Sequence, residues 1–131
     1  MSHFSELKTN ITSKRILQQA LTKMGFLMEE QEAGVEVRGF FGQTLPAEFK
    51  ALTRTHYDIG FKKNEEGSYE LVADWELMPR VSGIEQEPFL NALKKEYARI
   101  AITEIAKQRG YDLQCVEDEE GQNLEMVVTQ W

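Results

Sequence analysis

The chain has 131 residues, of which 41% are apolar and 28% charged, so it is long enough for one folded domain and short for two. Its 22 acidic and 15 basic residues give a net charge of −7. This balance argues against nucleic-acid binding as a main role and against adsorption to an anionic membrane.

Cysteine usage and the absence of targeting patterns narrow the class of protein further. Cys115 is the only cysteine, which excludes an internal disulfide and a metal site built from cysteine clusters within the chain. We find no pattern of a secretion signal and no apolar run of about 18 residues. We therefore expect a cytoplasmic protein with no cofactor, no metal and no membrane insertion.

The first third of the chain predicts a strand, a helix and a hairpin. Residues 3–9 are interpreted as a strand, and residues 13–24 place apolar side chains at helical spacing. Thr12 or Ser13 is the expected N-cap, and Gly25 follows the last turn. Residues 26–37 alternate around residues 32–34, which predicts a hairpin.

The middle of the chain is harder to interpret. Residues 41–56 fit either a short helix or an irregular strand, and Phe40 and Phe41 need not both fit the core. Residues 57–62 and 69–76 alternate on either side of a turn, which predicts two paired strands. Pro79 and Gly83 indicate a loop into the next helix.

The last third predicts a long helix after Pro88 and a second hairpin around residues 118–121. Because each helix is followed by a glycine, an aromatic residue and a hairpin with an acidic turn, the pattern suggests two βαββ-like halves. We predict an α+β two-layer sandwich, a mainly antiparallel sheet with two helices on one face, as a single domain over residues 1–131.

Charged side chains gather on one face of the predicted sheet. If helices cover the apolar face, strand alternation places a charged set on the uncovered face: Glu36, Arg38, Asp58, Lys62, Glu70 and Asp74. Two interpretations stay open. The set is either a solvated face, whose cross-strand ion pairs contribute roughly 0.2–1 kcal/mol each, or a binding surface for a partner.

A pocket is the alternative arrangement of some of these residues. His56, Tyr57, Asp58 and Asp74 could line a site for a small ligand or for acid–base chemistry, provided that the carboxylates are buried together. The spacing of His56 and His3 matches no zinc pattern, and the chain has neither a phosphate-binding loop nor a nucleophile elbow. We assign no catalytic residues.

The C-terminal hairpin carries three lesser candidates. Cys115 shares a strand face with Tyr111 and Leu113, which favours a buried, inert thiol over a nucleophile. Residues 117–120 are acidic but lack the ligand spacing of a calcium loop, so we expect a solvated turn. Trp131 should dock on the body of the protein or on another chain.

Several motifs in combination resemble one family. They are MSHFSELKT at the start of the chain, VRGFFGQ (37–43), YDIGF (57–61), YELVAD (69–74), YAR (97–99) and VVTQW (127–131). Over essentially the whole chain they resemble the small hypothetical chloroplast reading frame family of cyanobacteria and algal plastids. The resemblance implies a soluble accessory protein of the cyanobacterial cytoplasm or plastid stroma, and it supplies no catalytic residues.

Our leading hypothesis is a protein-interaction module without enzymatic activity. It would offer the charged sheet face to a protein partner or to a second copy, through Arg38, Asp58, Lys62, Glu70 and Asp74, with Arg38 as a bidentate anchor. The alternative is a small-ligand-binding protein or an enzyme with an acidic, tyrosine-lined pocket. A third hypothesis, nucleic-acid binding through Arg54, Lys62 and Lys63, is disfavoured by the net charge.

Overall fold

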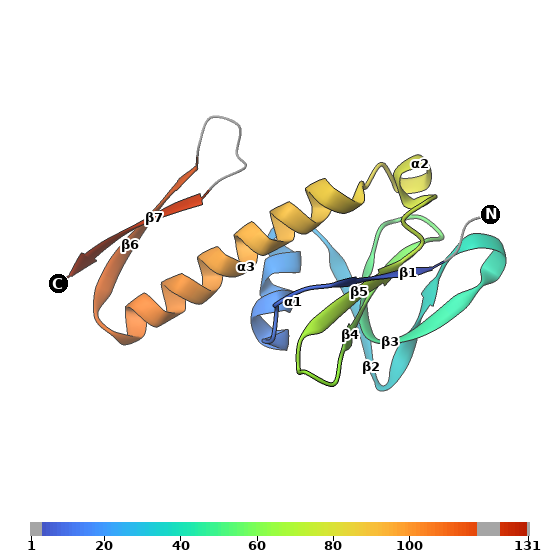
Figure 1. Cartoon of the computed structure of the whole chain (residues 1–131), viewed down its shortest axis with the longest axis horizontal. Helices are drawn as coiled ribbons and strands as arrows, with labels where there is room; N and C mark the ends of the chain where they lie inside the picture. Colours follow the sequence, from blue (N-terminus) through green and yellow to red (C-terminus); the bar gives the residue numbers. More distant parts are fainter. Residues whose placement is uncertain (1–3, 118–123, 131) are drawn as a thin grey trace.

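The computed structural model describes residues 4–117 and 124–130, with side chains described up to residue 110. In chain order the elements are β1 (Ser5–Lys8), α1 (Lys14–Lys23), β2 (Leu27–Arg38), the 3-10 turn η1 (Phe40–Gly42), β3 (Thr44–Leu52), β4 (Asp58–Lys63), β5 (Tyr69–Ala73), α2 (Met78–Ser82), α3 (Gln86–Gln108), β6 (Tyr111–Glu117) and β7 (Leu124–Gln130) (Figure 1).

The first five strands form one antiparallel sheet in the order β1-β5-β4-β3-β2. Lys62 stands opposite Glu70 and Gly60 opposite Val72, which confirms the predicted pairing of the two central strands. With α1 and α3 packed against this sheet, the predicted α+β class is confirmed. Residues 44–52, whose structure the sequence left open, form the long strand β3.

Helix α1 forms where the apolar stripe predicted it. The Ser13 side chain accepts a hydrogen bond from the Ile16 amide at 3.3 Å, which caps the first turn. Gly25 at φ +92° follows the helix in the left-handed region that favours glycine. The face that carries Leu17 and Leu21 is fully buried against the sheet.

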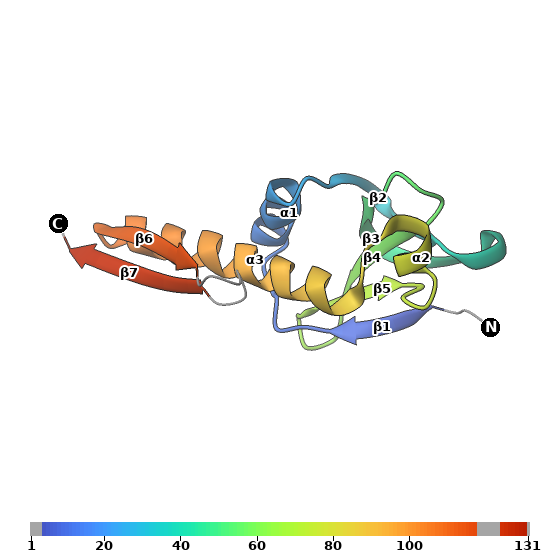
Figure 2. The same ribbon diagram turned by 90° about the horizontal axis from the view of Figure 1, so that it is seen from above.

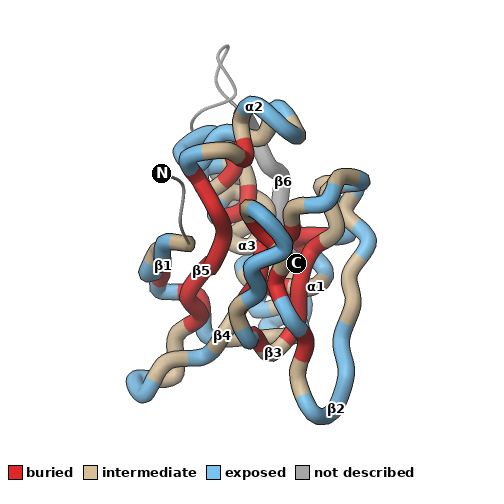
Figure 3. Tube along the Cα trace, turned by 90° about the vertical axis from the view of Figure 1, so that its right-hand side faces the viewer, coloured by how far each residue is buried: buried red, intermediate tan, exposed pale blue. Residues whose placement is uncertain are grey.

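The main core lies between the sheet and the helices. Phe49 and Phe61 stack with ring centroids 5.0 Å apart, and Phe89 and Leu93 of α3 close the same core. Figure 3 shows the unbroken buried stretch along β5, where every residue from Tyr69 to Ala73 is buried. A strand buried on both faces means that something also covers the face turned away from the helices.

The distal half of the β2–β3 hairpin provides that cover. The register between β2 and β3 shifts between Glu30 and Val35, where Gly34 has φ +92°, and the strand pair bends there (Figure 1). Val35, Val37 and Ala47 form a second small core, on which Phe4, the residue before β1, packs. The predicted hairpin around residues 32–34 is therefore wrong: β3 pairs with β2 on both sides of the glycine, which makes a bulge instead of a turn.

Gly60 of β4 permits this covering. A Cβ atom built on Gly60 would lie 2.2 Å from Val37 Cγ2 and 3.1 Å from Ala47 Cβ. The folded-over hairpin therefore presses directly on the backbone of the central strand. Only glycine leaves room for so close an approach.

Two further expectations need correction. Residues 79–83 were expected to form a loop, but Met78–Ser82 is a short helix, because Pro79 stands in the first turn, where no amide donor is needed. Strands β6 and β7 pair as predicted, yet they form a separate two-stranded sheet. The predicted two-layer sandwich and the two βαββ-like halves are accordingly not confirmed.

Helix α3 connects the body to that second sheet. Its first turns pack on the core, its middle lies along α1, and its last turns extend beyond α1 toward β6 and β7 (Figures 1 and 2). Tyr97 Oη accepts a hydrogen bond from the Ser13 amide at 3.0 Å, and Arg15 forms an ion pair with Glu104. None of the helices in the described ranges is long and apolar enough to cross a membrane.

The expectations for His3, for the acidic turn around 118–121 and for Trp131 lie outside the described residues, as does the side chain of Cys115.

Candidate functional site

Asp58, the first residue of β4, is the centre of a buried cluster of charged side chains. Its side chain is fully buried, and both oxygens accept hydrogen bonds from Arg38: Nε to Oδ2 at 2.9 Å and Nη2 to Oδ1 at 2.9 Å. The Arg38 backbone amide also donates to Oδ2 at 2.9 Å, and so does Lys50 Nζ at 2.9 Å. A bidentate guanidinium, a second cation and a backbone amide thus converge on one buried carboxylate.

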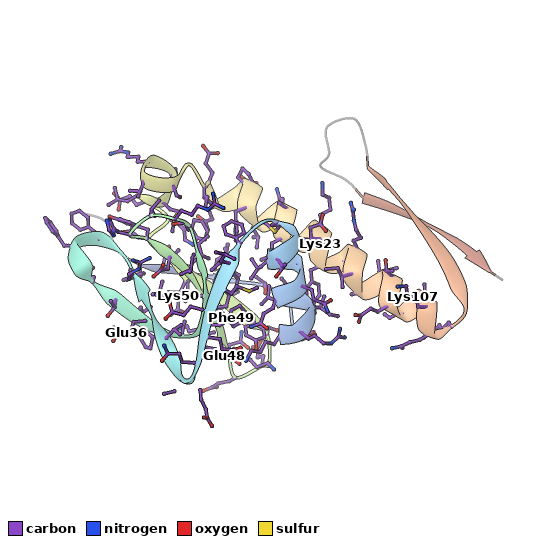
Figure 4. All side chains as sticks on the ribbon, turned by 180° about the vertical axis from the view of Figure 1, so that it is seen from behind. Lys23, Glu36, Glu48, Phe49, Lys50 and Lys107 are labelled. Carbon is purple, nitrogen blue, oxygen red and sulfur yellow. The ribbon has the colours of Figure 1, made fainter. Side chains whose placement is uncertain are left out.

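Lys50 is the member that sequence reasoning missed. It lies on β3, and its side chain is 8% exposed. Besides binding Asp58, Nζ donates to the Glu36 carbonyl oxygen at 2.8 Å. The Glu36 carbonyl points away from β3, on the same side of β2 as the Arg38 amide. Lys50 therefore satisfies a backbone acceptor that does not face β3. Figure 4 labels Lys50 and Glu36 in a view from behind.

The hydrogen bonds of Asp58 to the Arg38 amide and of Lys50 to the Glu36 carbonyl occupy part of the free edge of β2. The Arg38 amide and the Glu36 carbonyl are backbone groups of the same strand, two residues apart, and both bind side chains from the body of the sheet. An added strand would use such groups. Asp58 and Lys50 fill them from within the chain.

The electrostatics of the cluster keep Asp58 ionised. Burial by itself raises the pKa of this carboxyl, but the hydrogen bonds from Arg38 and Lys50 outweigh it, so the pKa of Asp58 lies below its usual range. A carboxylate with a lowered pKa and no free oxygen is unsuited to proton transfer near neutral pH. The arrangement is a structural ion pair that anchors the folded-over hairpin.

Arg38 also joins two loops at one end of the molecule. Its Nη2 donates to the Thr55 carbonyl oxygen at 3.0 Å, in the loop between β3 and β4. Within that loop the hydroxyls of Thr53 and Thr55 hydrogen-bond to each other at 2.6 Å. Arg54 between them is exposed and has φ +67°, an unusual value for a side chain other than glycine.

The second of these loops is the tip of the β2–β3 hairpin. Phe41 is 87% exposed, has φ +54°, and contacts the ring of Phe40 with centroids 4.2 Å apart. The tip is closed by hydrogen bonds from the Gly39 amide to Gln43 and from the Gln43 amide to Phe40, at 2.9 and 3.0 Å. Among the described residues, the only non-glycine positions with positive φ are thus Phe41 and Arg54, in loops that Arg38 ties together.

The structure separates the five predicted binding residues. Arg38 and Asp58 meet, but Asp58, Glu70 and Asp74 are 0%, 6% and 1% exposed, so the expected uncovered face is wrong for them. The physical reason is the folded-over hairpin, which covers much of that face. Lys62 remains partly exposed and forms its ion pair with Glu6 of β1. Whether the five bind a partner stays a prediction.

Asp74 is not paired with Asp58. Its Oδ1 accepts a hydrogen bond from the Leu77 amide at 3.3 Å and its carbonyl oxygen accepts one from Met78 at 2.9 Å, so it shapes the turn into α2. His56 is exposed in the 53–57 loop. No hydrogen bond joins Asp74 to Asp58 among the described residues, and the tyrosine-lined pocket of the alternative stays a prediction.

The surface has one hollow beside the ion cluster and another along α1. A polar recess of about 350 Å³ adjoins the ion cluster and is lined by Glu29, Gln31, Gly34, Val35, Glu36, Arg38, Thr44 and Lys50. A more apolar groove of about 750 Å³ runs along α1, between Met28 and Ile100. No group of three or more potential metal ligands is found in the part of the chain that the structure describes.

The fold and cluster define an α+β protein whose sheet is closed over by its own hairpin, with a buried ion pair at the closure and two strained loops at one end. A family model described as "Protein of unknown function (DUF1257)" matches residues 20–127, and the chain belongs to this family. Two relatives are called "Uncharacterized protein ycf35". The one from Cyanophora paradoxa is 28% identical over 131 residues, covering 100% of this chain and 98% of its own length. The one from Guillardia theta is 32% identical over 111 residues, covering 85% and 83%.

These matches confirm the resemblance to the hypothetical chloroplast reading frame family. No solved structure matches the chain.

Proposed function

We propose that this chain is a non-enzymatic protein-interaction module and that it binds its partner through the loop end, which we define as residues 39–43 and 53–57. The observation that carries the proposal is Phe41, which is 87% exposed while its backbone is held at φ +54°. The cyanobacterial cytoplasm or the plastid stroma remains the predicted location.

Phe41 lowers the folding stability of the isolated chain in two ways. A left-handed backbone costs a residue with a Cβ atom about 1–2 kcal/mol. Leaving a large apolar side chain in water also forgoes about 1.5–3 kcal/mol of burial free energy. Strained residues of this kind gather at binding sites, where the surrounding structure holds them in place. A partner that buries the ring would recover the second cost.

The loop end is held in position before a partner arrives. Asp58 and Lys50 bind the strand that leads into the tip, Arg38 binds the neighbouring loop, and the Phe4 ring lies beneath Gly39, 2.7 Å from a Cβ built there. A fixed loop loses little conformational entropy on binding. Aromatic residues are enriched at the centres of protein interfaces.

In this proposal the predicted site residues take different roles. Arg38 and Asp58 are positioning residues, because they hold the loops but have each other as partners. Lys62 lies on the exposed part of the sheet, while Glu70 and Asp74 are buried and have no direct part in the contact. For the small-ligand alternative, the polar recess beside Lys50 is a candidate site. No observation favours this site over the loop end.

Capture from a cyanobacterial or plastid lysate tests the proposal, with the wild-type chain and Phe41→Asn compared by quantitative mass spectrometry. Asparagine tolerates the left-handed backbone, so this change removes the ring and keeps the loop. Ile105→Gln is the matched control, because Ile105 is 49% exposed in the last turns of α3, away from the loop end.

A partner that is retained by Ile105→Gln and lost by Phe41→Asn is the expected result. If every captured protein is retained equally by the wild type and by Phe41→Asn, the loop end is not the binding surface.

A further inference from the structure

We infer that the partner offers an acidic surface around an apolar socket; this inference rests on the proposed function. Three segments meet at the end of the molecule opposite β6 and β7: the hairpin tip, the 53–57 loop and α2 (Figures 1 and 2). Figure 3 faces this end.

The charge of this end differs from that of the whole chain. Residues 39–44, 53–57 and 77–84 contain Arg54, Arg80 and His56 and no aspartate or glutamate, although the chain has 22 acidic and 15 basic residues. Asp58, at the edge, is neutralised by Arg38 and Lys50. These three segments of an acidic protein thus carry no carboxylate of their own, and the exposed Glu76 and Glu85 border α2 on either side.

The groups at this end are accessible. Arg54 and Arg80 are exposed, and neither forms an ion pair with any residue in the described ranges. Val81 of α2 is 42% exposed and adds apolar surface to that of Phe41. Exposed carboxylates border the three segments at Glu36, Glu76 and Glu85.

Arginine beside exposed apolar side chains fits a protein partner better than a nucleic acid. Phosphate backbones are held by many cations, and this end offers two unpaired arginines. Two guanidinium groups around an aromatic anchor instead match carboxylates placed around an apolar socket. The cations would raise the association rate and set specificity, while Phe41 would supply most of the affinity.

Selection of short random peptides displayed on phage tests the inference, with the full chain immobilised. Enriched peptides are synthesised and their affinities measured against the wild type, Phe41→Asn, Arg54→Asn/Arg80→Gln, and the control Lys23→Gln/Lys107→Gln. The control removes the same number of charges from two exposed lysines that lie away from the loop end (Figure 4). Asparagine at position 54 keeps the left-handed backbone available.

The expected peptides carry a large apolar residue flanked by aspartate or glutamate. Their affinity should fall about 30-fold or more in Phe41→Asn, as for the loss of an interface hot spot. In the double arginine variant it should fall about three- to tenfold and lose its salt dependence, and in the lysine control it should not change.

Failure of this inference can be distinguished from failure of the proposed function. Peptides that depend on Phe41 but lack acidic residues, or that ignore the arginine variant, would overturn this inference and leave the proposed function standing. If no enriched peptide responds to Phe41→Asn, the proposed function itself fails. Phe41-dependent binding of phosphatidylglycerol vesicles or of oligothymidylate, in place of acidic peptides, would also overturn the inference.

Discussion

Asp58 binds Arg38 at three points, through Nε, Nη2 and the backbone amide, although the two residues lie on β4 and β2, which do not pair in the sheet. A side chain from the sheet interior thereby takes the place that a neighbouring strand would occupy at the β2 edge. Together with Lys50 on the Glu36 carbonyl, this contact decides where the hairpin tip lies.

Replacing Asp58 with asparagine should lower the free energy of unfolding by about 3 kcal/mol. The change leaves the buried Lys50 without its carboxylate, and removal of one partner from a buried ion pair typically costs about 3–5 kcal/mol. Arg38 remains partly hydrated, which places the estimate at the lower end. Urea unfolding measures the effect, and Glu6→Gln at the exposed pair with Lys62 is the control, expected within about 1 kcal/mol of wild type. Equal losses in both variants would contradict the structural role.

The contribution of Asp58 should disappear in acid. Because its pKa is lower in the folded chain than the ordinary value of about 3.9, the unfolded chain binds more protons in that range. The stabilisation is therefore complete above about pH 4 and is lost as the pH falls through the lower, folded value. Urea midpoints of the wild type and Asp58→Asn should converge progressively as the pH falls below the ordinary carboxyl pKa of about 3.9. A gap that stays constant would show that the carboxylate is not the source of the difference.

Gly60→Ala should destabilise the chain by about 1–3 kcal/mol, because the new methyl group meets Val37. Val37→Ala removes the opposing methyl groups. In a double-mutant cycle, the double variant should then lose less stability than the sum of the single variants, with a coupling of about 1 kcal/mol. Strict additivity would mean that the hairpin does not press on Gly60 in solution.

Phe41→Asn should leave the free energy of unfolding unchanged or raise it by up to about 1 kcal/mol, because asparagine relieves backbone strain at φ +54°. The same variant is expected to lose its partner. A stable variant that no longer binds would separate folding from function at one position. A clear loss of stability would instead assign Phe41 to the fold.

The sequence predicts the parts of this fold that depend on local pattern. The apolar stripe and the serine cap define α1, and alternation around residues 64–67 defines the pairing of β4 with β5. The hairpin predicted over residues 26–37 is wrong because a glycine in a bulge and a glycine in a turn look alike when the partner strand is unknown. The position of β6 and β7 depends on tertiary contacts that no local pattern specifies.

The site was predicted in part for the same reason. Alternation correctly placed Asp58 on the face turned away from the helices, but that face was assumed to meet water. Two features of the sequence indicate that this face is covered. Gly60 lies inside a strand, where close approach of another backbone is expected, and Lys50 lies between apolar neighbours. The contact between Arg38 and Asp58 is a consequence of the bend in the hairpin and could not be read from spacing.

The strand order has a consequence for synthesis of the chain. Among the described strands β1 pairs with β5 alone, where Ser5 stands opposite Ala73, so β1 is synthesised well before its partner and waits until most of the sheet has been made. Such distant pairing slows folding and leaves an unpaired strand exposed to other nascent chains. β1 is four residues long and carries Glu6 and Lys8, features that discourage premature association. The N-terminal strand is thus suited to being the last piece of the sheet to join.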